Sequence, residues 1–249
     1  MVKEERFEYI LNYLKHSEKI SYELMAVAMN VSEDTVRRDI ELLHQNGLLT
    51  KVRGGAILRS KNPLSFQDRS DYLSGGKEII ALKAQPFIKK NQTVFMDGGT
   101  TICTIAAHLP IDASFRVVTN NVALIPILST FKHIEIILVG GIYDRITEIT
   151  YGLQACEEIS NYVADLYFMG TCAISHQFGI TAAFREDCAI KKAMMANAAR
   201  TIAISNIEKL DTTEAFKVCD MEDIDTLITD MASDDARLNP YRNMGFAIV

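Results

Sequence analysis

The sequence predicts an α/β protein with an N-terminal winged helix-turn-helix and a larger, doubly wound, mostly parallel α/β domain. Short segments with the apolar spacing of helices meet at a polar turn near Asn30, and a glycine turn follows at Gly54-Gly55. From about Lys77 onward, short apolar strands alternate with helices, which is typical of a parallel sheet. We expect the small domain over residues 1–58, a linker over 59–76 and the larger domain over 77–249.

Two helices are expected before the polar turn. The first ends near His16 and is predicted from apolar residues at i, i+3, i+4 and i+7, namely Phe7, Ile10, Leu11 and Leu14. The second is expected over residues 22–29, with an inward face of Leu24, Val27 and Ala28. Asn30-Val31 then turns the chain.

A third helix is expected over residues 33–46, because Ser32 is a good N-cap and Gly47 suits a left-handed stop. Its buried face is predicted from spacings of four and three, at Val36, Ile40 and Leu43. Thr35, Arg37 and Arg38 then lie on the outer side near the helix start, where a recognition helix contacts bases and backbone.

The next segment, L-L-T-K-V-R-G-G-A-I-L, predicts a wing of two short strands around Gly54-Gly55. Lys51 and Arg53 near its tip would reach phosphates or the minor groove. The alternative is a simple packing unit with solvated arginines. The turn, the paired arginines and the basic wing together favour DNA binding, with contacts expected from Ser32, Thr35, Arg37, Arg38, Lys51 and Arg53.

Charge is unevenly distributed along the chain. Residues 1–60 balance nine Lys/Arg against nine Asp/Glu, so the net charge of −6 belongs to the rest. Residues 37–59 hold five basic side chains against two acidic ones, a local excess that suits phosphate contact. Because the excess is modest, one copy should bind weakly, and we expect a homodimer or homotetramer on double-stranded operator DNA.

In the larger domain, apolar segments predict a doubly wound sheet. Strands are expected over residues 93–96, 116–119, 135–139, 166–169, 201–205, 226–229 and 246–249. Helices are expected over residues 101–108, 122–131, 153–160 and 186–199. Ligands of such sheets bind beyond the carboxyl ends of the strands.

The sharpest chemical motif of this domain is T-V-F-M-D-G-G-T-T, residues 93–101. A strand ends at Met96, the chain turns through Asp97-Gly98-Gly99, and a helix begins at Thr100 or Thr101. Glycines let backbone N–H groups approach an anion, and the helix N-terminus adds partial positive charge, so the turn suits a phosphate. An ordinary strand-to-helix turn explains the motif equally well. Neither a Walker lysine nor a G-x-G-x-x-G spacing is present, which disfavours nucleotide hydrolysis and dinucleotide binding.

Further loops are expected at the same rim. Thr119-Asn120, Gly140-Gly141 and Gly170-Thr171 follow three other predicted strands, whose carboxyl ends share one edge in a parallel sheet. Glycines and small polar residues gathered on one rim indicate a binding site. Lys191 and Lys209 either supply cations to it or are ordinary surface lysines.

Membrane, disulfide and zinc proteins are disfavoured. The N-terminus is charged from residue 3, and no apolar run reaches the roughly 20 residues that span a bilayer, so we expect a cytoplasmic protein. The five cysteines lie far apart without a C-x-x-C pair, which argues against a disulfide framework or a zinc site. We expect neither a metal nor a cofactor.

The string V-S-E-D-T-V-R-R-D-I, residues 31–40, followed by G-L-L-T-K-V-R-G-G-A, resembles the helix-turn-helix signature of the DeoR family of bacterial transcriptional regulators. The resemblance covers nearly the whole chain. It implies a C-terminal domain with a ribose-5-phosphate isomerase fold that binds a phosphorylated sugar or a related metabolite.

The same resemblance implies effector contacts at the strand ends. Residues 97–101 match the family's phosphate loop, Thr119-Asn120 and Gly140-Gly141 the next strand ends, and E-D-C-A-I-K the segment of Glu186 and Lys191. Lys209 matches a segment usually written A-D-x-x-K, but this chain reads S-N-I-E-K, so Asn206 replaces the usual Asp. The expected effector-binding residues are Asp97, Gly98, Gly99, Thr100, Thr101, Thr119, Asn120, Gly140, Gly141, Gly170, Glu186, Lys191 and Lys209.

The isomerase resemblance also raises an enzyme alternative. Aldose–ketose isomerisation needs a carboxylate base, and the related isomerases carry an acid-rich segment where this chain has G-T-C-A-I-S, residues 170–175. Only Glu186 remains as a base, so we expect no catalysis. We interpret the chain as a transcriptional regulator, foremost a repressor of a sugar operon controlled by a phosphorylated sugar. An activator of the same architecture is the alternative, and a sugar-phosphate isomerase is a distant third.

Overall fold

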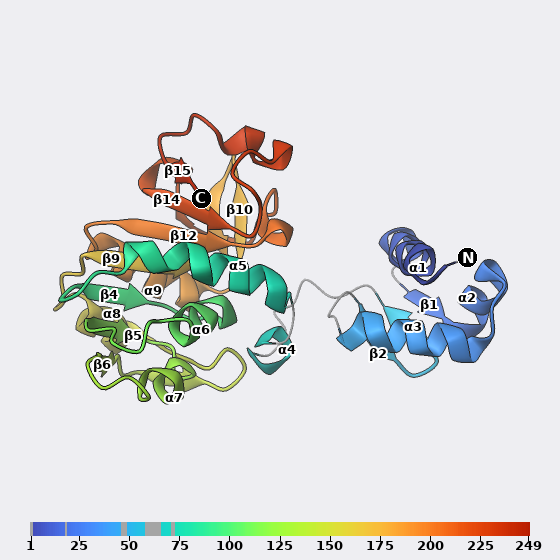
Figure 1. The fold of residues 1–249 in the computed structure, drawn as a ribbon, viewed down its shortest axis with the longest axis horizontal. Coiled ribbons are helices and arrows are strands. Elements are labelled where there is room, and N and C mark those ends of the chain that lie inside the picture. Colours follow the sequence, from blue (N-terminus) through green and yellow to red (C-terminus); the bar gives the residue numbers. More distant parts are fainter. Residues whose placement is uncertain (1, 18, 46–48, 58–65, 71–72) are drawn as a thin grey trace. The chain divides into compact units, whose positions relative to one another are not determined.

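The computed structural model describes residues 2–17, 19–45, 49–57, 66–70 and 73–249. The chain divides into two compact units, residues 1–73 and 74–249, and each is described by itself (Figure 1). None of the described helices is both long enough and apolar enough to span a bilayer.

The N-terminal unit consists of helices packed on a small antiparallel sheet, in which β3 lies between β1 and β2. Its elements are α1 (Lys3–Ser17), β1 (Lys19–Ser21), α2 (Tyr22–Met29), α3 (Glu33–Gln45), β2 (Thr50–Val52), β3 (Gly55–Ile57) and α4 (Phe66–Ser70). The sequence did not predict β1, which attaches the wing to the helices. Gly55 pairs with Ser21, and a Cβ on Gly55 would lie 1.9 Å from the backbone oxygen of Ile20, so no side chain fits there.

The buried faces of α1 and α3 agree with the prediction, whereas that of α2 does not. The core contains Ile10, Leu14, Val36, Ile40 and Leu43, and Phe7 and Leu11 pack at its margin. On α2, the predicted inward residues Leu24, Val27 and Ala28 are exposed, Val27 at 78%, and the buried residues are Tyr22, Met25 and Met29. Because α2 is apolar on most sides, spacing alone did not distinguish its faces. The predicted stop at Gly47 lies outside the described residues.

In the described part of the C-terminal unit, seven parallel strands form a sheet in the order β15-β14-β12-β9-β4-β5-β6. They are β4 (Thr93–Met96), β5 (Arg116–Thr119), β6 (Glu135–Leu138), β9 (Leu166–Gly170), β12 (Thr201–Ser205), β14 (Thr226–Thr229) and β15 (Ala247–Ile248). Both ends of each strand agree with the predicted ends to within one residue. The chain runs from β4 through β5 to β6 and then crosses to β9, so the strand order reverses between β4 and β9.

Helices cover both faces of this sheet. In Figure 1, α5 (Ser74–Ala84) and α6 (Thr100–Ala107) lie in front of it, and α8 (Leu153–Ile159) and α9 (Arg185–Ala196) lie behind. The α7 helix (Leu124–Leu128) is shorter than the expected 122–131 and contains Pro126, which has no N–H to donate. Short 3-10 helices complete the unit as η1 (Gln85–Phe87), η2 (Ile207–Lys209), η3 (Met221–Asp223) and η4 (Ala236–Tyr241).

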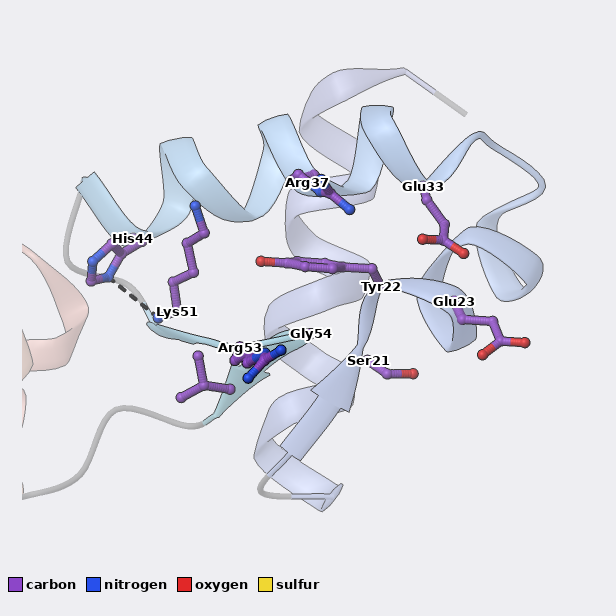
Figure 2. Close-up of a pocket in the computed structure, with 10 residues that line it drawn as sticks. Ser21, Tyr22, Glu23, Glu33, Arg37, His44, Lys51, Arg53 and Gly54 are labelled. Atoms are coloured by element: carbon purple, nitrogen blue, oxygen red, sulfur yellow. Dashed lines mark hydrogen bonds between the residues drawn. The ribbon is translucent and has the colours of Figure 1, made fainter.

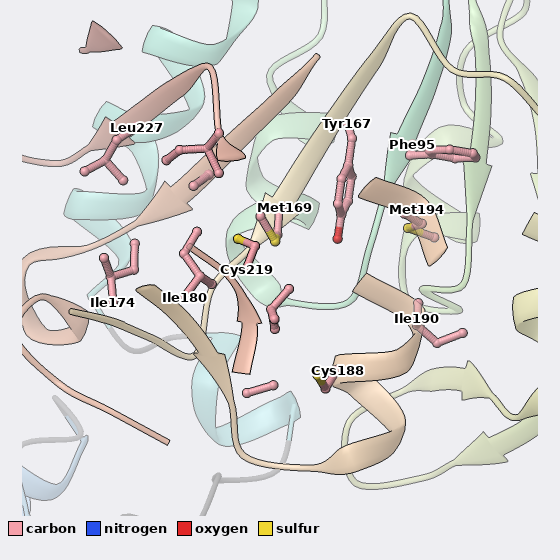
Figure 3. Packing of buried hydrophobic residues seen from close by; sticks show 14 of the residues in the cluster. Phe95, Tyr167, Met169, Ile174, Ile180, Cys188, Ile190, Met194, Cys219 and Leu227 are labelled. Carbon is pink, nitrogen blue, oxygen red and sulfur yellow. The ribbon is translucent and has the colours of Figure 1, made fainter. Parts of the chain in front are cut away.

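The larger core lies between the sheet and the α8–α9 layer. Figure 3 shows Phe95 and Tyr167 of adjacent strands near Ile190 and Met194 of α9. The rings of Phe95 and Tyr167 meet edge to face, with centroids 6.3 Å apart. This packing fixes α9 against β4 and β9, where the strand order reverses.

Two antiparallel additions were not predicted. One is a hairpin of β7 (Ile142–Asp144) and β8 (Ile149–Tyr151), and the other is a sheet of β10 (Ala173–Ser175), β11 (Gly179–Ala182) and β13 (Phe216–Cys219). Strands of three or four residues are too short for alternation to separate them from loops.

The first helix of the C-terminal unit, α5, begins at Ser74, inside the range predicted as a linker. Gly76 lies against the carboxylate of Asp230, since a Cβ there would be 2.7 Å from Oδ2. Farther along α5, the Lys83 ammonium donates to the backbone oxygens of Thr229 at 2.9 Å and Met231 at 2.6 Å. These contacts attach α5 to the carboxyl end of β14.

Candidate functional site

The start of α3 is shaped by a left-handed residue and a hydroxyl cap. Asn30 ends α2 with φ 52°, and Val31 N donates back to the Ala26 oxygen at 3.0 Å. Ser32 Oγ accepts from Thr35 N at 3.3 Å and lies 2.9 Å from Thr35 Oγ1. Ser32 and Thr35, both predicted as DNA contacts, therefore form the N-terminal cap of α3.

Arg37 and Arg38 are exposed on α3, as predicted, and Arg37 has an aromatic support. The guanidinium carbon of Arg37 lies 5.2 Å from the ring centroid of the buried Tyr22, an arrangement visible in Figure 2. A guanidinium over an aromatic face is attracted by the ring quadrupole. Tyr22 N also donates to the Gly54 oxygen at 3.1 Å, so one residue joins α2, α3 and the wing. The sequence reasoning missed Tyr22.

The wing is tied to the C-terminal half of α3. The Lys51 ammonium forms an ion pair with Glu41 of α3, and Lys51 N donates to His44 Nδ1 at 3.4 Å. Arg53 is exposed. Both Lys51 and Arg53 lie on the wing as predicted, but a phosphate would compete with Glu41 for Lys51.

An open groove of about 740 Å³ runs between α3 and the wing (Figure 2). It is lined by Ser21, Tyr22, Glu23, Glu33, Arg37, His44, Lys51, Val52, Arg53 and Gly54. Three of these are cations on α3 and the wing, while the carboxylates Glu23 and Glu33 stand toward the helix starts. The groove thus offers a basic side for phosphate and acceptors for base donors.

In the C-terminal unit, the predicted effector residues share one edge of the sheet because all its strand pairs are parallel. Asp97 follows β4, Asn120 follows β5, Gly140 follows β6, and Gly170 ends β9. The reversal between β4 and β9 is the position at which doubly wound sheets bind ligands. We call these strand-end loops, together with Asn206 after β12, the carboxyl rim.

Asp97 is the buried anchor of the rim. It is 0% exposed and accepts from Lys191 Nζ at 2.6 Å, Tyr167 OH at 2.7 Å and Gly170 N at 2.8 Å. Its carboxylate therefore joins β4, β9 and α9. Burial and the neighbouring Asp97 raise the pKa of Tyr167 well above its usual range, so its hydroxyl remains a donor.

Lys191 lies between two carboxylates. Burial lowers the pKa of Lys191, but Asp187 and Asp97 outweigh burial and raise that pKa above its ordinary value, so the side chain is a cation. Asp187 Oδ1 lies 3.2 Å from Lys191 Nζ. The sequence reasoning named the exposed Glu186 and missed Asp187, although a spacing of four on a helix was the available signal.

The glycines of the rim have different roles. Gly99 precedes α6 with φ 133°, and a Cβ there would meet no atom within 4 Å, so a ligand has room to approach. Gly98 and Gly170 are required by packing, because a Cβ would lie 2.5 Å from Ile149 Cγ2 and 2.8 Å from the Gly98 oxygen respectively. Thr100 is buried and Thr101 half-buried at the start of α6.

Gly140 and Gly141 are also explained by local packing. Gly140 N donates to Glu158 Oε2 at 2.9 Å, so this amide is already occupied. Gly141 has φ 137°, and a Cβ there would lie 2.5 Å from the Tyr151 oxygen. Among the described contacts, none joins this pair to the Asp97 group.

Several asparagine side chains at the rim have oxygens that accept no hydrogen bond among the described residues. Thr119 Oγ1 donates to the Met96 oxygen at 2.5 Å, and Asn120 Nδ2 donates to the Thr150 oxygen at 2.8 Å. Within the described residues, the buried Oδ1 atoms of Asn120, Asn121 and Asn206 accept no hydrogen bond. Buried acceptors without donors are uncommon in proteins, and they suit a ligand that carries hydroxyl groups.

Lys209 follows β12, so it lies on the other side of the β4–β9 reversal of strand order from Asn120, which follows β5. Its ammonium donates to the Thr171 oxygen at 2.5 Å, directly after β9. Lys209 therefore places positive charge at the end of β9, whereas the charge of Lys191 is already offset by Asp97 and Asp187.

Two family models match the chain along its two units. The DeoR-like helix-turn-helix domain matches residues 6–62, and the DeoR C terminal sensor domain matches residues 74–231.

Curated relatives match over almost their whole length. The HTH-type transcriptional repressor GlcR of Bacillus subtilis (strain 168) is 34% identical over 239 residues, covering 95% of this chain and 92% of the relative. The lactose phosphotransferase system repressor of Lactococcus lactis subsp. lactis is 31% identical over 235 residues, covering 92% of each.

Solved structures are similar only at a distance. eIF2B beta from Chaetomium thermophilum has a TM-score of 0.48 at 13% identity, covering 68% of this chain and 52% of that one. Ribose 5 phosphate isomerase A from Neisseria gonorrhoeae has a TM-score of 0.40 at 16% identity, covering 55% and 53%.

Proposed function

Because the chain belongs to the DeoR family of transcriptional regulators, we propose that it is a repressor of a sugar operon that releases its operator when a phosphorylated sugar binds the carboxyl rim. The observation that carries this proposal is the similarity of nearly the whole chain to repressors, one of them named for a lactose phosphotransferase system. The two sites supply the chemistry.

The groove of the N-terminal unit supports the DNA-binding half of the proposal. Arg37 and Arg38 project from a capped helix, and Lys51 and Arg53 project from the wing beside it. This arrangement supports a complex in which α3 enters the major groove and the wing contacts the adjacent backbone. Because DNA is its proposed partner, we place the protein in the cytoplasm.

The carboxyl rim supports the effector half. Lys209 supplies a cation, Gly99 leaves open space before α6, and the buried Oδ1 atoms of Asn120 and Asn206 would accept from hydroxyl groups. A phosphate with a polyol attached satisfies all of these groups at once. Asp97 acts by holding Lys191 and the Gly170 amide in place.

The same arrangement argues for sensing without catalysis. A proton abstraction beside the carbonyl of a sugar needs a carboxylate base at the reacting carbon. Asp97 and Asp187 are both paired with Lys191, and Glu186 is exposed at the start of α9. We therefore assign the rim a binding role only.

One gel-shift experiment tests both halves. The protein is titrated onto DNA from upstream of its own gene, and pentose and hexose monophosphates, with inorganic phosphate as a separate probe, are then added. We expect one sugar phosphate to dissociate the complex. In Gly99→Trp, which fills the open space at the rim, the DNA complex should form normally and resist that sugar phosphate.

The matched control is Gly245→Trp, at another glycine with positive φ and open surroundings. It should bind DNA and respond like the wild type. If no DNA complex forms, the regulator assignment fails. If the complex forms and no member of the panel affects it, the sugar-phosphate effector is wrong.

A further inference from the structure

The start of α3 carries a carboxylate that pairs with no cation of the described residues. Glu33 is the first residue of α3, is exposed, and lines the open groove together with Arg37 of the same helix (Figure 2). Arg37 lies four residues along α3, a spacing that allows an ion pair, but among the described contacts none joins the two side chains. The guanidinium of Arg37 lies instead on the ring of Tyr22. Glu33 is therefore available to a partner outside the protein.

Stabilisation of the helix start does not account for the position of Glu33. The hydroxyl of Ser32 already accepts from Thr35 N and caps α3. A negative charge in the first turn stabilises a helix through its dipole, and the neighbouring Asp34 supplies the same charge. Asp34 is exposed as well, but it is not among the described residues that line the groove. Of these two neighbours, it is Glu33 that adds a carboxylate to the groove.

A carboxylate in this groove is unfavourable next to the backbone of DNA. Phosphates are attracted to the groove cations, Lys51 and Arg53 among them, and are repelled by Glu33. A negative charge is favourable at such an interface only where it meets a hydrogen-bond donor, and the donors of the DNA grooves are on the bases. Glu33 therefore suits base recognition, whereas the cations suit the backbone.

The chemistry of the major groove indicates which base a carboxylate selects. Cytosine presents its N4 amino donor there, whereas guanine presents the acceptors N7 and O6, and thymine presents the acceptor O4 with a methyl group. Adenine presents a donor at N6 with an acceptor at N7 beside it, a pair that suits the amide of Gln or Asn. The carboxylate of a glutamate accepts from cytosine and is repelled by the two acceptors of guanine.

Two of the described groove residues are carboxylates, and their places in the fold distinguish them. Glu23 lies in the first turn of α2, whereas Glu33 begins α3. In a helix-turn-helix, the first residues of the second helix contact base edges, while the first helix crosses the backbone. Glu33 is therefore the carboxylate at a base-reading position.

We propose that Glu33 specifies a cytosine of the operator by accepting a hydrogen bond from its N4 amino group in the major groove. The inference deepens the proposed function and rests on it, since it requires α3 to enter that groove. In this complex, Lys51 and Arg53 of the wing contact the backbone, which carries no sequence information directly, and Glu33 discriminates among bases.

Selection of binding sites by the full chain from a pool of randomised duplex DNA tests the proposal. The wild type should enrich sites with cytosine at one position where Glu33→Ala shows no preference. Replacement of that C·G pair by T·A should weaken binding of the wild type at least about fivefold in anisotropy titrations, and binding of Glu33→Ala by less than about twofold. Glu33→Gln should bind adenine at that position at least as tightly as cytosine, because an amide pairs with adenine N6 and N7.

Asp34→Ala and Glu23→Ala are the matched controls. The first removes the same charge from the helix start, the second removes the other groove carboxylate, and both should keep the cytosine preference. A wild type that enriches no sequence overturns the regulator function and the inference with it. Enriched sites whose cytosine preference survives in Glu33→Ala, or is lost equally in either control, overturn the inference alone. A Glu33→Gln preference identical to that of the wild type also overturns it.

Discussion

At the scale of single residues, the most informative contact is the ring of Tyr22 beneath Arg37. The sequence shows two outward arginines on α3, and both are exposed as predicted. It does not show that the first residue of α2 supports one of them. A side chain held on an aromatic face samples fewer rotamers, so less entropy is lost when it binds DNA.

We expect Tyr22→Leu to weaken operator binding about two- to fivefold, because an exposed cation–π contact contributes about 0.5–1 kcal/mol. Fluorescence anisotropy with labelled operator measures the change. In an Arg37→Ala background, the same substitution should have no further effect, since the guanidinium is absent. Tyr9→Leu, at an exposed tyrosine of α1, is the control. Equal losses in both backgrounds would show that Tyr22 acts only through packing.

Residue types could be predicted from the sequence better than their partners. Arg37, Arg38, Lys51 and Arg53 were identified because basic residues near a helix start and a glycine turn follow a local pattern. The Glu41 partner of Lys51 lies ten residues away on another element, and no local spacing indicates it. The family resemblance indicated Glu186, but of these two neighbouring carboxylates it is Asp187 that pairs with Lys191.

At the scale of elements, Asp97 connects the strands and the helix that meet where the strand order reverses. Its carboxylate accepts from β9 twice and from α9 once, while its own backbone continues β4 toward α6. The motif between β4 and α6 fitted a phosphate cradle and an ordinary strand-to-helix turn equally well, and the family resemblance favoured the cradle. It did not indicate that the aspartate would point inward, which depends on Tyr167 and Lys191 far along the chain.

Asp97→Asn should lower the unfolding free energy by about 3 kcal/mol, because removal of one partner leaves a buried charge poorly compensated. Asp187 still pairs with Lys191 in this variant, which limits the loss of unfolding free energy. Urea unfolding followed by circular dichroism measures the shift in midpoint at constant slope. Asp112→Asn, in an exposed pair with Lys90, should unfold like the wild type. A midpoint equal to that of this control would mean that the pair is not stabilising.

Strands of the parallel sheet could be predicted well because each is a run of apolar residues bounded by turn signals. The α5 helix was not predicted, since Gly75 and Gly76 in its first turn suggested a linker. The hairpin of β7 and β8 was not predicted either, because strands of three residues are too short for alternation to mark them. The inward face of α2 was wrong because a helix that is apolar all round has no unique stripe.

At the scale of the whole molecule, we expect the affinity for DNA to be a property of two paired copies. Each copy presents Arg37, Arg38, Lys51 and Arg53, while the net charge of the chain is −6. Four phosphate contacts per reader give eight for a pair, and counterion release then makes binding strongly dependent on salt.

We expect the logarithm of the operator binding constant to fall with the logarithm of salt concentration with a slope near −7 for the wild type. For Arg53→Ala, which removes one phosphate contact from each of two readers, the slope should be near −5. Anisotropy titrations over a range of KCl concentrations measure both. Val163→Asp, at an exposed side chain of the C-terminal unit, serves as the control. A slope for Arg53→Ala that is shallower by only about one would contradict a paired reader.

The attachment of α5 to the sheet has a mechanical consequence. The C-terminal unit begins at Ser74, and within ten residues Gly76 and Lys83 have fastened the helix to the carboxyl end of β14. Tension that arrives along the backbone at Leu73 is therefore borne first at the carboxyl end of β14. A displacement there reaches residue 73 through one helix, without crossing the interior of the fold.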